Sequence, residues 1–190
     1  DLWNKNFQPL RNNSDIENMK SYFLVISNFG SSMGNRNWTE WLSVGRKNET
    51  ITSKKDEDEL IKFILQDSAI AINIVQAIRY LAKEYPEKNI IVRPHPGDDI
   101  KNWHNIARKF KNIYVVDTEI PLSSWISKAS VIIQNGCTSA LEAVYQKKPV
   151  ISFGSQRDSG SIAIPSKVSL ICEKIDDLKN KIEVSLSNEK

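Results

Sequence analysis

Three short segments of this sequence combine cationic, hydroxyl and glycine residues in patterns that could bind a phosphate or a sugar. The first is Arg93-Pro94-His95-Pro96-Gly97, which directly follows an apolar run. The guanidinium of Arg93 suits a phosphate or a carboxylate. His95 is stiffened by a proline on each side and could donate to a phosphate or transfer a proton. The alternative is a proline-rich turn in which His95 only caps a neighbouring carbonyl group.

The second segment is NGCTSALE, residues 135–142, after the apolar run SVIIQ. The turn residue Gly136 precedes small residues at the expected start of a helix, where free backbone N–H groups can receive a pyrophosphate. The candidate phosphate contacts are Gly136, Cys137, Thr138 and Ser139. Glu142 lies one turn later and could hydrogen-bond a ribose or sugar hydroxyl. Ser139 and Glu142 also have the spacing of a capping box, in which they would only satisfy the helix end.

The third segment is NFGSSMGN, residues 28–35, after the apolar run YFLVIS. It lacks the GxGxxG spacing of dinucleotide-binding loops, but Asn28 and Gly30 could allow a sugar or phosphate to approach the backbone. A plain surface loop fits the same residues. Ser155 and Arg157, which follow the run PVISF, are further candidates, with Arg157 directed to a phosphate.

Apolar runs that alternate with helical patterns must position these segments. Strands are expected at 22–27, 89–94, 113–117, 130–134, 149–153 and 168–172. Helices are expected at about 56–85, 100–110, 121–128, 139–146 and 175–186. The segment before the longest helix is polar and contains tryptophan, and Asp67 and Ser68 are expected to kink or break that helix.

Short apolar strands separated by helices predict an α/β fold, a doubly wound, Rossmann-like parallel sheet of about six strands with helices on both faces. In such a sheet, ligands bind beyond the carboxyl ends of the strands, where the strand order reverses. All three segments fall at predicted strand ends. Residues 1–20 are polar and rich in asparagine, so we expect a linker or N-terminal arm there, and the ligand-binding domain at 21–190.

Composition excludes several classes of protein. The 190 residues include 26 Lys and Arg against 23 Asp and Glu, and a net charge of +3 with scattered basic residues argues against nucleic-acid binding. Cys137 and Cys172 lie far apart without a CxxC pattern, so neither a disulfide scaffold nor a metal site is expected, and a reducing cytoplasmic location is favoured. Cys137 lacks a neighbouring base, which makes a structural thiol more typical than a nucleophile. No apolar run approaches the roughly 20 residues of a membrane span.

Three pieces of the sequence resemble the C-terminal half of GT-B-type glycosyltransferases, particularly bacterial surface carbohydrate biosynthesis proteins. They are FLVISNFG, IIVRPHPGDD and PLSSWISKASVIIQNGCTSALEAVYQKKPVISF, and the resemblance covers roughly residues 22–155. Similar turns and helices occur in Kdo transferases, bacterial sialyltransferases and glycerophosphotransferases of wall polymers. The resemblance implies a domain that binds a nucleotide-sugar donor, linked to CMP, CDP or UDP, with no separate cofactor.

The resemblance also implies roles for particular residues. His95, Thr138 and Ser139 would contact the donor phosphates, and Glu142 would hold the ribose or sugar. Cys137 departs from the family pattern, since serine or another small residue is usual there. No catalytic residue is assigned.

A GT-B enzyme needs two Rossmann-like halves, with the reaction in the cleft between them. The first residues, DLWNKNFQPL, lack an initiator Met. We therefore expect a glycosyltransferase fragment without its N-terminal acceptor domain, which binds donor without turning it over. The parent enzyme is expected in the cytoplasm, with a peripheral association at the inner face of the cell membrane left open.

Two alternatives stay open. The chain could be half of an enzyme like the UDP-sugar 2-epimerases, which share the architecture, although only Glu142 offers a carboxylate near the predicted site. It could also be a non-enzymatic, flavodoxin-like regulatory or assembly module.

Overall fold

The computed structural model describes residues 18–19, 21–116, 120–154 and 163–187. Six strands form one sheet in the order β3-β2-β1-β4-β5-β6, and every neighbouring pair is parallel. The strands are β1 (Tyr22–Ile26), β2 (Asn89–Arg93), β3 (Ile113–Val115), β4 (Ala129–Gln134), β5 (Val150–Phe153) and β6 (Leu170–Cys172). The predicted doubly wound parallel sheet is confirmed, and its order reverses between β1 and β4.

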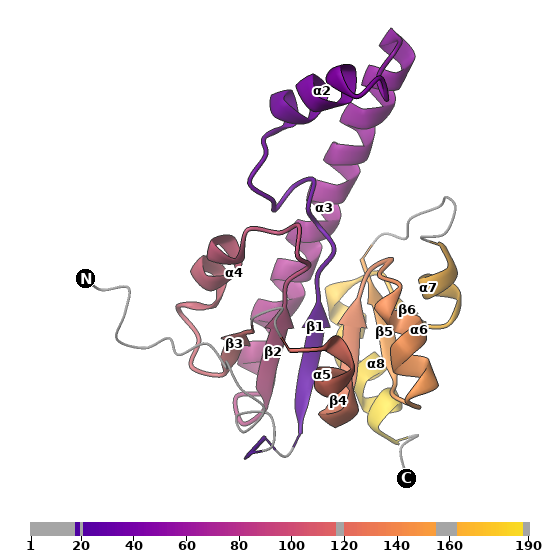
Figure 1. Cartoon of the computed structure of the whole chain (residues 1–190). Helices are drawn as coiled ribbons and strands as arrows, with labels where there is room; N and C mark the ends of the chain where they lie inside the picture. Colours follow the sequence, from indigo (N-terminus) through magenta and orange to yellow (C-terminus); the bar gives the residue numbers. More distant parts are fainter. Residues whose placement is uncertain (1–17, 20, 117–119, 155–162, 188–190) are drawn as a thin grey trace, which may run out of the picture.

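Helices cover both faces of the sheet (Figure 1). One core cluster joins the strands to α3 (Lys54–Glu84), α4 (Ile100–Ala107) and α8 (Ile175–Ser187). The other joins them to α5 (Leu122–Lys128) and α6 (Ser139–Tyr145). The short helix α7 (Ala163–Lys167) packs beside β6 and α6. Burial on both faces explains why the strands are apolar at nearly every position.

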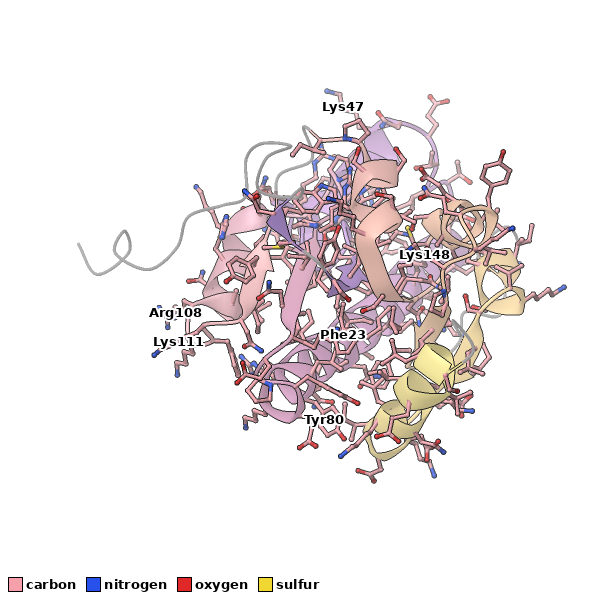
Figure 2. The ribbon with its side chains drawn as sticks, turned by 90° about the horizontal axis from the view of Figure 1, so that it is seen from below. Phe23, Lys47, Tyr80, Arg108, Lys111 and Lys148 are labelled. Atoms are coloured by element: carbon pink, nitrogen blue, oxygen red, sulfur yellow. The ribbon has the colours of Figure 1, made fainter. Side chains whose placement is uncertain are left out.

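The central strand β1 shows this most clearly, because all five of its residues are buried. Phe23 lies inside the molecule, with its ring 5.1 Å from that of Tyr85 in an edge-on contact, whereas Arg108 and Lys111 point outward (Figure 2). Each large apolar side chain buried in this way contributes about 1.5–3 kcal/mol. The core therefore fixes the strand ends at which the candidate ligand residues lie.

Helix α2 (Trp38–Lys47) was not expected from the sequence. It begins at Asn37 with a capping box, in which the Asn37 side chain accepts from the Glu40 backbone and the Glu40 side chain accepts from the Asn37 backbone. Together, α2 and the first half of α3 project beyond the edge of the sheet where the strands end (Figure 1). We call this unit the α2–α3 hairpin, residues 38–67.

The predicted break in the long helix at Asp67 and Ser68 is wrong. Helix α3 runs without interruption for 31 residues. Ser68 Oγ donates to the carbonyl of Ile64 within the helix. Asp67 is buried and accepts hydrogen bonds from Ser31 and Ser32 of the loop after β1, so tertiary contacts stabilise a residue that disfavours a helix interior.

By length and composition alone, α3 could cross a membrane, and within the described residues it is the one helix that passes this test. Core helices of proteins outside membranes pass it as well. The second half of α3 packs on the sheet through Ile70, Ile74, Ile78 and Leu81, all of which are nearly inaccessible to solvent. This burial explains why one side of the second half of α3 is apolar.

Smaller differences concern the C-terminal third. The sixth strand covers only three residues, 170–172, and α7 was not expected. The predicted N-terminal arm lies almost entirely outside the described residues, as do Ser155 and Arg157. The roles predicted for them stay predictions.

Candidate functional site

The candidate residues gather where β1, β2 and β4 end. Strand β1 lies between β2 and β4, so the segments that follow these three strands emerge side by side. Ser27 N donates to the carbonyl of Arg93 at 3.2 Å, which joins the end of β1 to the end of β2 directly. The site therefore lies beside the reversal of strand order, as expected for this class of sheet.

A buried carboxylate that the sequence did not single out organises this region. Asp98 accepts from Ser27 Oγ at 2.5 Å, from the Phe29 backbone N–H at 3.1 Å and from Trp103 Nε1 at 2.9 Å. Ser27 Oγ in turn accepts from the His95 backbone N–H at 2.9 Å. Asp98 thus ties together the loop after β1, the loop after β2 and helix α4.

His95 is exposed at this edge, and its ring orientation is defined by its own loop. The Gly97 backbone N–H donates to His95 Nδ1 at 3.0 Å. Because Nδ1 accepts, the neutral imidazole carries its proton on Nε2, which can donate to a ligand. The predicted role of His95 as a phosphate donor is compatible with this arrangement.

The loops after β1 and β2 pack backbone against backbone at Gly34. A Cβ atom on Gly34 would lie 2.8 Å from the Gly97 carbonyl oxygen and would also clash with the Gly30 carbonyl. Only glycine fits this contact. The close approach fixes the position of Gly30, and with it one side of the candidate site.

The turn between β4 and α6 is held by side chains of its own. Gly136 has φ of 65°, a left-handed conformation that favours glycine. Gln134 Oε1 accepts from the Cys137 backbone N–H at 2.8 Å, and Ser139 Oγ donates to Cys137 Sγ at 2.8 Å. Ser139 is buried, whereas Thr138 is exposed. Of the two predicted hydroxyl contacts, Thr138 is the one open to a ligand.

The capping-box alternative for this helix is wrong. The N-cap residue is Thr138 rather than Ser139, and no side chain caps the helix there. Ser139 and Glu142 therefore do not cap this helix. Glu142 lies half-buried on the first turn, and its carboxylate is not used for capping.

Arg93 points toward this turn from the end of β2. It lies on the same side of the sheet as Ile91, which packs against α5 and α6, and it interacts electrostatically with Cys137 and Glu142. Burial lowers the pKa of Arg93 from its ordinary value, and these two residues oppose the shift. Within the described part of the chain, Arg93 forms no ion pair, and its buried Nε has no hydrogen-bond partner. The site thus holds a half-buried cation that forms no ion pair with the described residues, although the Glu142 carboxylate lies near enough to interact with it.

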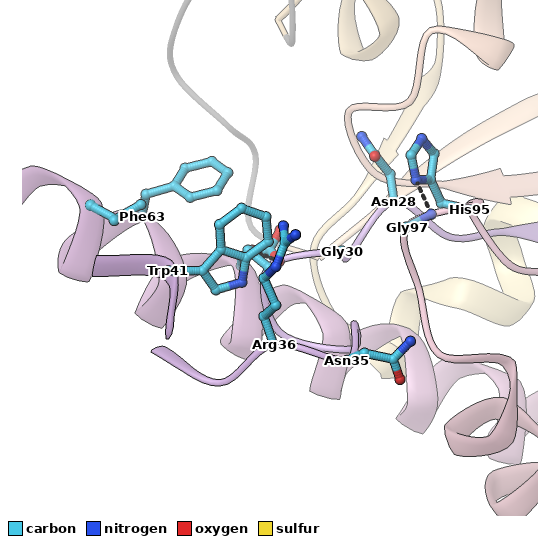
Figure 3. Close-up of a pocket in the computed structure, with 11 residues that line it drawn as sticks. Asn28, Gly30, Asn35, Arg36, Trp41, Phe63, His95 and Gly97 are labelled. Atoms are coloured by element: carbon cyan, nitrogen blue, oxygen red, sulfur yellow. Dashed lines mark hydrogen bonds between the residues drawn. The ribbon is translucent and has the colours of Figure 1, made fainter. Parts of the chain in front are cut away.

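A cavity of about 600 Å³ lies between the loops after β1 and β2 and the α2–α3 hairpin (Figure 3). Asn28, Gly30 and His95 line one side of it. The lining from the hairpin and the loop before it includes Asn35, Arg36, Trp41, Leu60, Phe63 and Asp67. A volume of this size is typical of small-molecule sites.

The structure therefore divides the predicted residues into two neighbouring groups. Arg93 interacts electrostatically with Cys137 and Glu142 of the β4–α6 turn and helix, and Asn28, Gly30 and His95 line the cavity. Among the residues that the structure describes, no three His, Cys, Asp or Glu side chains are placed to hold a metal ion.

Ser27, Asp98 and the hairpin side of the cavity were not predicted from the sequence. Ser27 ends a buried strand and Asp98 follows a glycine turn, a pairing that is visible only when the two strands are known to be neighbours. The hairpin could have been found from the capping pattern at Asn37 and Glu40.

Comparisons with known proteins point to the same fold. Neither the protein-family models nor the curated protein sequences give a match. Among solved structures, the UDP-GlcNAc 2-epimerase of Methanocaldococcus jannaschii, in complex with UDP-GlcNAc and UDP, matches with a TM-score of 0.56 and 17% identity over 91% of this chain and 41% of that chain. A second structure of that epimerase matches with a TM-score of 0.56 and 17% identity, over 92% of this chain and 41% of that chain. The E. coli heptosyltransferase WaaC with ADP matches with a TM-score of 0.49 and 11% identity, over 88% of this chain and 46% of that chain.

The chain spans about two fifths of the length of the epimerase structures that it matches. At this level of identity the likeness concerns the fold. The chain therefore has a GT-B-like, Rossmann-type α/β fold that corresponds to one part of a larger enzyme structure.

Proposed function

We propose that this chain is the donor-binding half of a glycosyltransferase that uses a nucleotide sugar to build a bacterial surface polysaccharide. The donor's phosphates would lie at the ends of β1, β2 and β4. The acceptor domain would belong to another part of the parent protein, so we expect donor binding without turnover by this chain. A cytoplasmic location at the inner membrane face is part of the same proposal.

The observation that carries the proposal is the unpaired state of Arg93. A half-buried guanidinium that is partly desolvated and held in no ion pair is costly in the free protein, and an anionic ligand would relieve that cost. Arginine also matches phosphate oxygens in a bidentate geometry. Arg93 lies beside the strand-order reversal, the usual ligand position in such sheets.

Two further observations support a nucleotide sugar over another anion. The exposed Thr138 hydroxyl, next to Cys137, offers a donor, and the half-buried Glu142 carboxylate, which interacts electrostatically with Arg93, offers an acceptor; this combination suits a phosphate joined to a hydroxylated ring. The matched epimerase structure is also a complex with UDP-GlcNAc and UDP.

The proposed chemistry is electrostatic. Negative charge builds on the departing nucleotide as the bond to the sugar breaks, and donors fixed in place before the reaction stabilise that charge. Arg93 supplies a permanent cation, and His95 supplies an Nε2–H donor oriented by Gly97. We propose both as phosphate contacts, with Glu142 on the ribose or the sugar.

Calorimetric titration with CMP-, CDP- and UDP-linked sugars tests the proposal. We expect one base to bind, and we expect Arg93→Gln to weaken that binding by about 30-fold or more, since loss of one partner of a buried charge pair costs about 2–5 kcal/mol. Arg46→Gln is the matched control, because Arg46 is exposed on α2 and pairs with Glu57 outside the cavity. Failure of a folded sample to bind any of the three donors would overturn the proposal.

A further inference from the structure

The cavity has a second wall whose chemistry the donor phosphates do not explain. Trp41 of α2 and Phe63 of α3 form this wall together with Arg36, which precedes α2 (Figure 3). Asn28 and His95 face it from the opposite side. A ligand in the cavity would therefore lie between an aromatic surface and the loop that carries His95.

The aromatic wall carries a cation. Arg36 Cζ lies 5.2 Å from the centroid of the Trp41 ring, a distance at which the ring attracts the guanidinium. Within the described ranges, Arg36 forms no ion pair with a carboxylate. Its N–H groups are therefore free to contact a ligand that lies against the wall.

The cavity offers hydrogen-bond donors and little negative charge. His95 presents Nε2–H because Nδ1 is occupied by Gly97. Asp67 is the sole acidic side chain among the described lining residues, and its carboxylate already accepts from Ser31 and Ser32.

An aromatic surface with an adjacent guanidinium and spare N–H donors suits a ring that carries an anionic group. The volume of about 600 Å³ is also larger than a phosphate alone would need. We propose that the cavity binds an acidic saccharide, with its ring against Trp41 and Phe63 and its carboxylate or phosphate on Arg36. That this saccharide is the glycosyl part of the donor rests on the proposed function.

Two matched pairs of ligands test the inference. The first pair is UDP-glucuronic acid and UDP-glucose, which differ by a carboxylate in place of a hydroxymethyl group. The second pair is methyl glucuronide and methyl glucoside, which need no nucleotide site and can be measured by ligand-observed NMR, with and without saturating UDP. Simultaneous binding of UDP and methyl glucuronide would assign the cavity to an acceptor sugar, and competition would assign it to the donor sugar.

We expect the acidic member of each pair to bind about tenfold more tightly than the neutral member. Arg36→Gln should abolish this preference and leave the affinity for UDP itself unchanged. Arg46→Gln, which removes the same charge from the hairpin outside the cavity, should keep the preference.

Equal affinity for the acidic and neutral members, or no saccharide binding with UDP binding retained, would overturn the inference and leave the proposed function standing. The reverse outcome, in which methyl glucuronide binds through Arg36 but no nucleotide binds, would overturn the proposed function and leave the acidic-saccharide cavity standing.

Discussion

Replacing Asp98 by asparagine should destabilise the protein because this carboxylate accepts from three donors at once. Oδ2 accepts from Ser27 and Trp103, and Oδ1 accepts from the Phe29 backbone. Asparagine keeps a single oxygen, so in either orientation at least one buried N–H faces an NH₂ group and loses its partner. Asp98→Asn thus removes a bond while preserving the side chain's shape.

The size of the effect follows from these three contacts. An unsatisfied buried donor costs about 1–3 kcal/mol. The remaining bonds also weaken, since hydrogen bonds to an ionised group are roughly twice as strong as neutral ones. We expect a total loss of about 2–4 kcal/mol in the free energy of unfolding. For a chain of this length, that loss corresponds to a decrease in Tm of about 5–15 °C.

Thermal unfolding followed by circular dichroism measures this loss, and Asp99→Asn is the matched control. Asp99 caps α4 by accepting from the Lys101 backbone, a role that asparagine fills as well as aspartate. Both variants change the net charge equally, so only the Asp98 network distinguishes them. If Asp98→Asn unfolded at the same temperature as Asp99→Asn, Asp98 would not organise the site as we describe.

Three further predictions concern the packing and titration of single residues. Gly34→Ala should destabilise the protein by about 1–3 kcal/mol in denaturant titrations, because its Cβ would lie 2.8 Å from the Gly97 carbonyl oxygen; unchanged stability would contradict that contact. Burial raises the pKa of the Cys172 thiol to about 11, so iodoacetamide at pH 8 should label Cys137 in the native protein and both thiols after unfolding, as read by mass spectrometry; equal native labelling would contradict the burial. Hydrogen bonds from Thr52 and Ser53 hold the pKa of Asp56 at about 2, below its ordinary 3.8, so its contribution to stability is present above about pH 4 and is lost as the pH falls toward 2. Asp56→Asn should flatten that part of the stability profile, and an unaltered profile would refute the assignment.

The sheet could be predicted from the sequence because its strands are buried on both faces. Runs such as 22–26 and 130–134 are apolar without alternation, a pattern that favours parallel strands between helices. The positions of Arg93 and His95 at a strand end follow from the same pattern. The loops that carry the candidate residues could therefore be assigned to one edge of the sheet.

The cavity could not be predicted, because it is formed by residues that are distant in sequence. Trp41 and Phe63 lie on helices of which only a minority of residues are buried, so the sequence pattern does not reveal that the two side chains line one cavity. Asp67 disfavours a helix interior by local propensity, but it is stabilised by two serines about 35 residues earlier in the sequence. Contacts of this kind become visible only when the loop after β1 is placed against α3.

The most direct test of whether Arg93 binds a donor phosphate is to measure both the donor affinity and the Tm of Arg93→Gln beside the unaltered protein. If the guanidinium is desolvated without an ion-pair partner, the variant should unfold at the same temperature or a higher one in the absence of ligand. It should also bind the preferred nucleotide sugar about 30-fold or more weakly. A variant that lost stability and kept its affinity would show that Arg93 serves the fold rather than a donor phosphate, and would contradict the account.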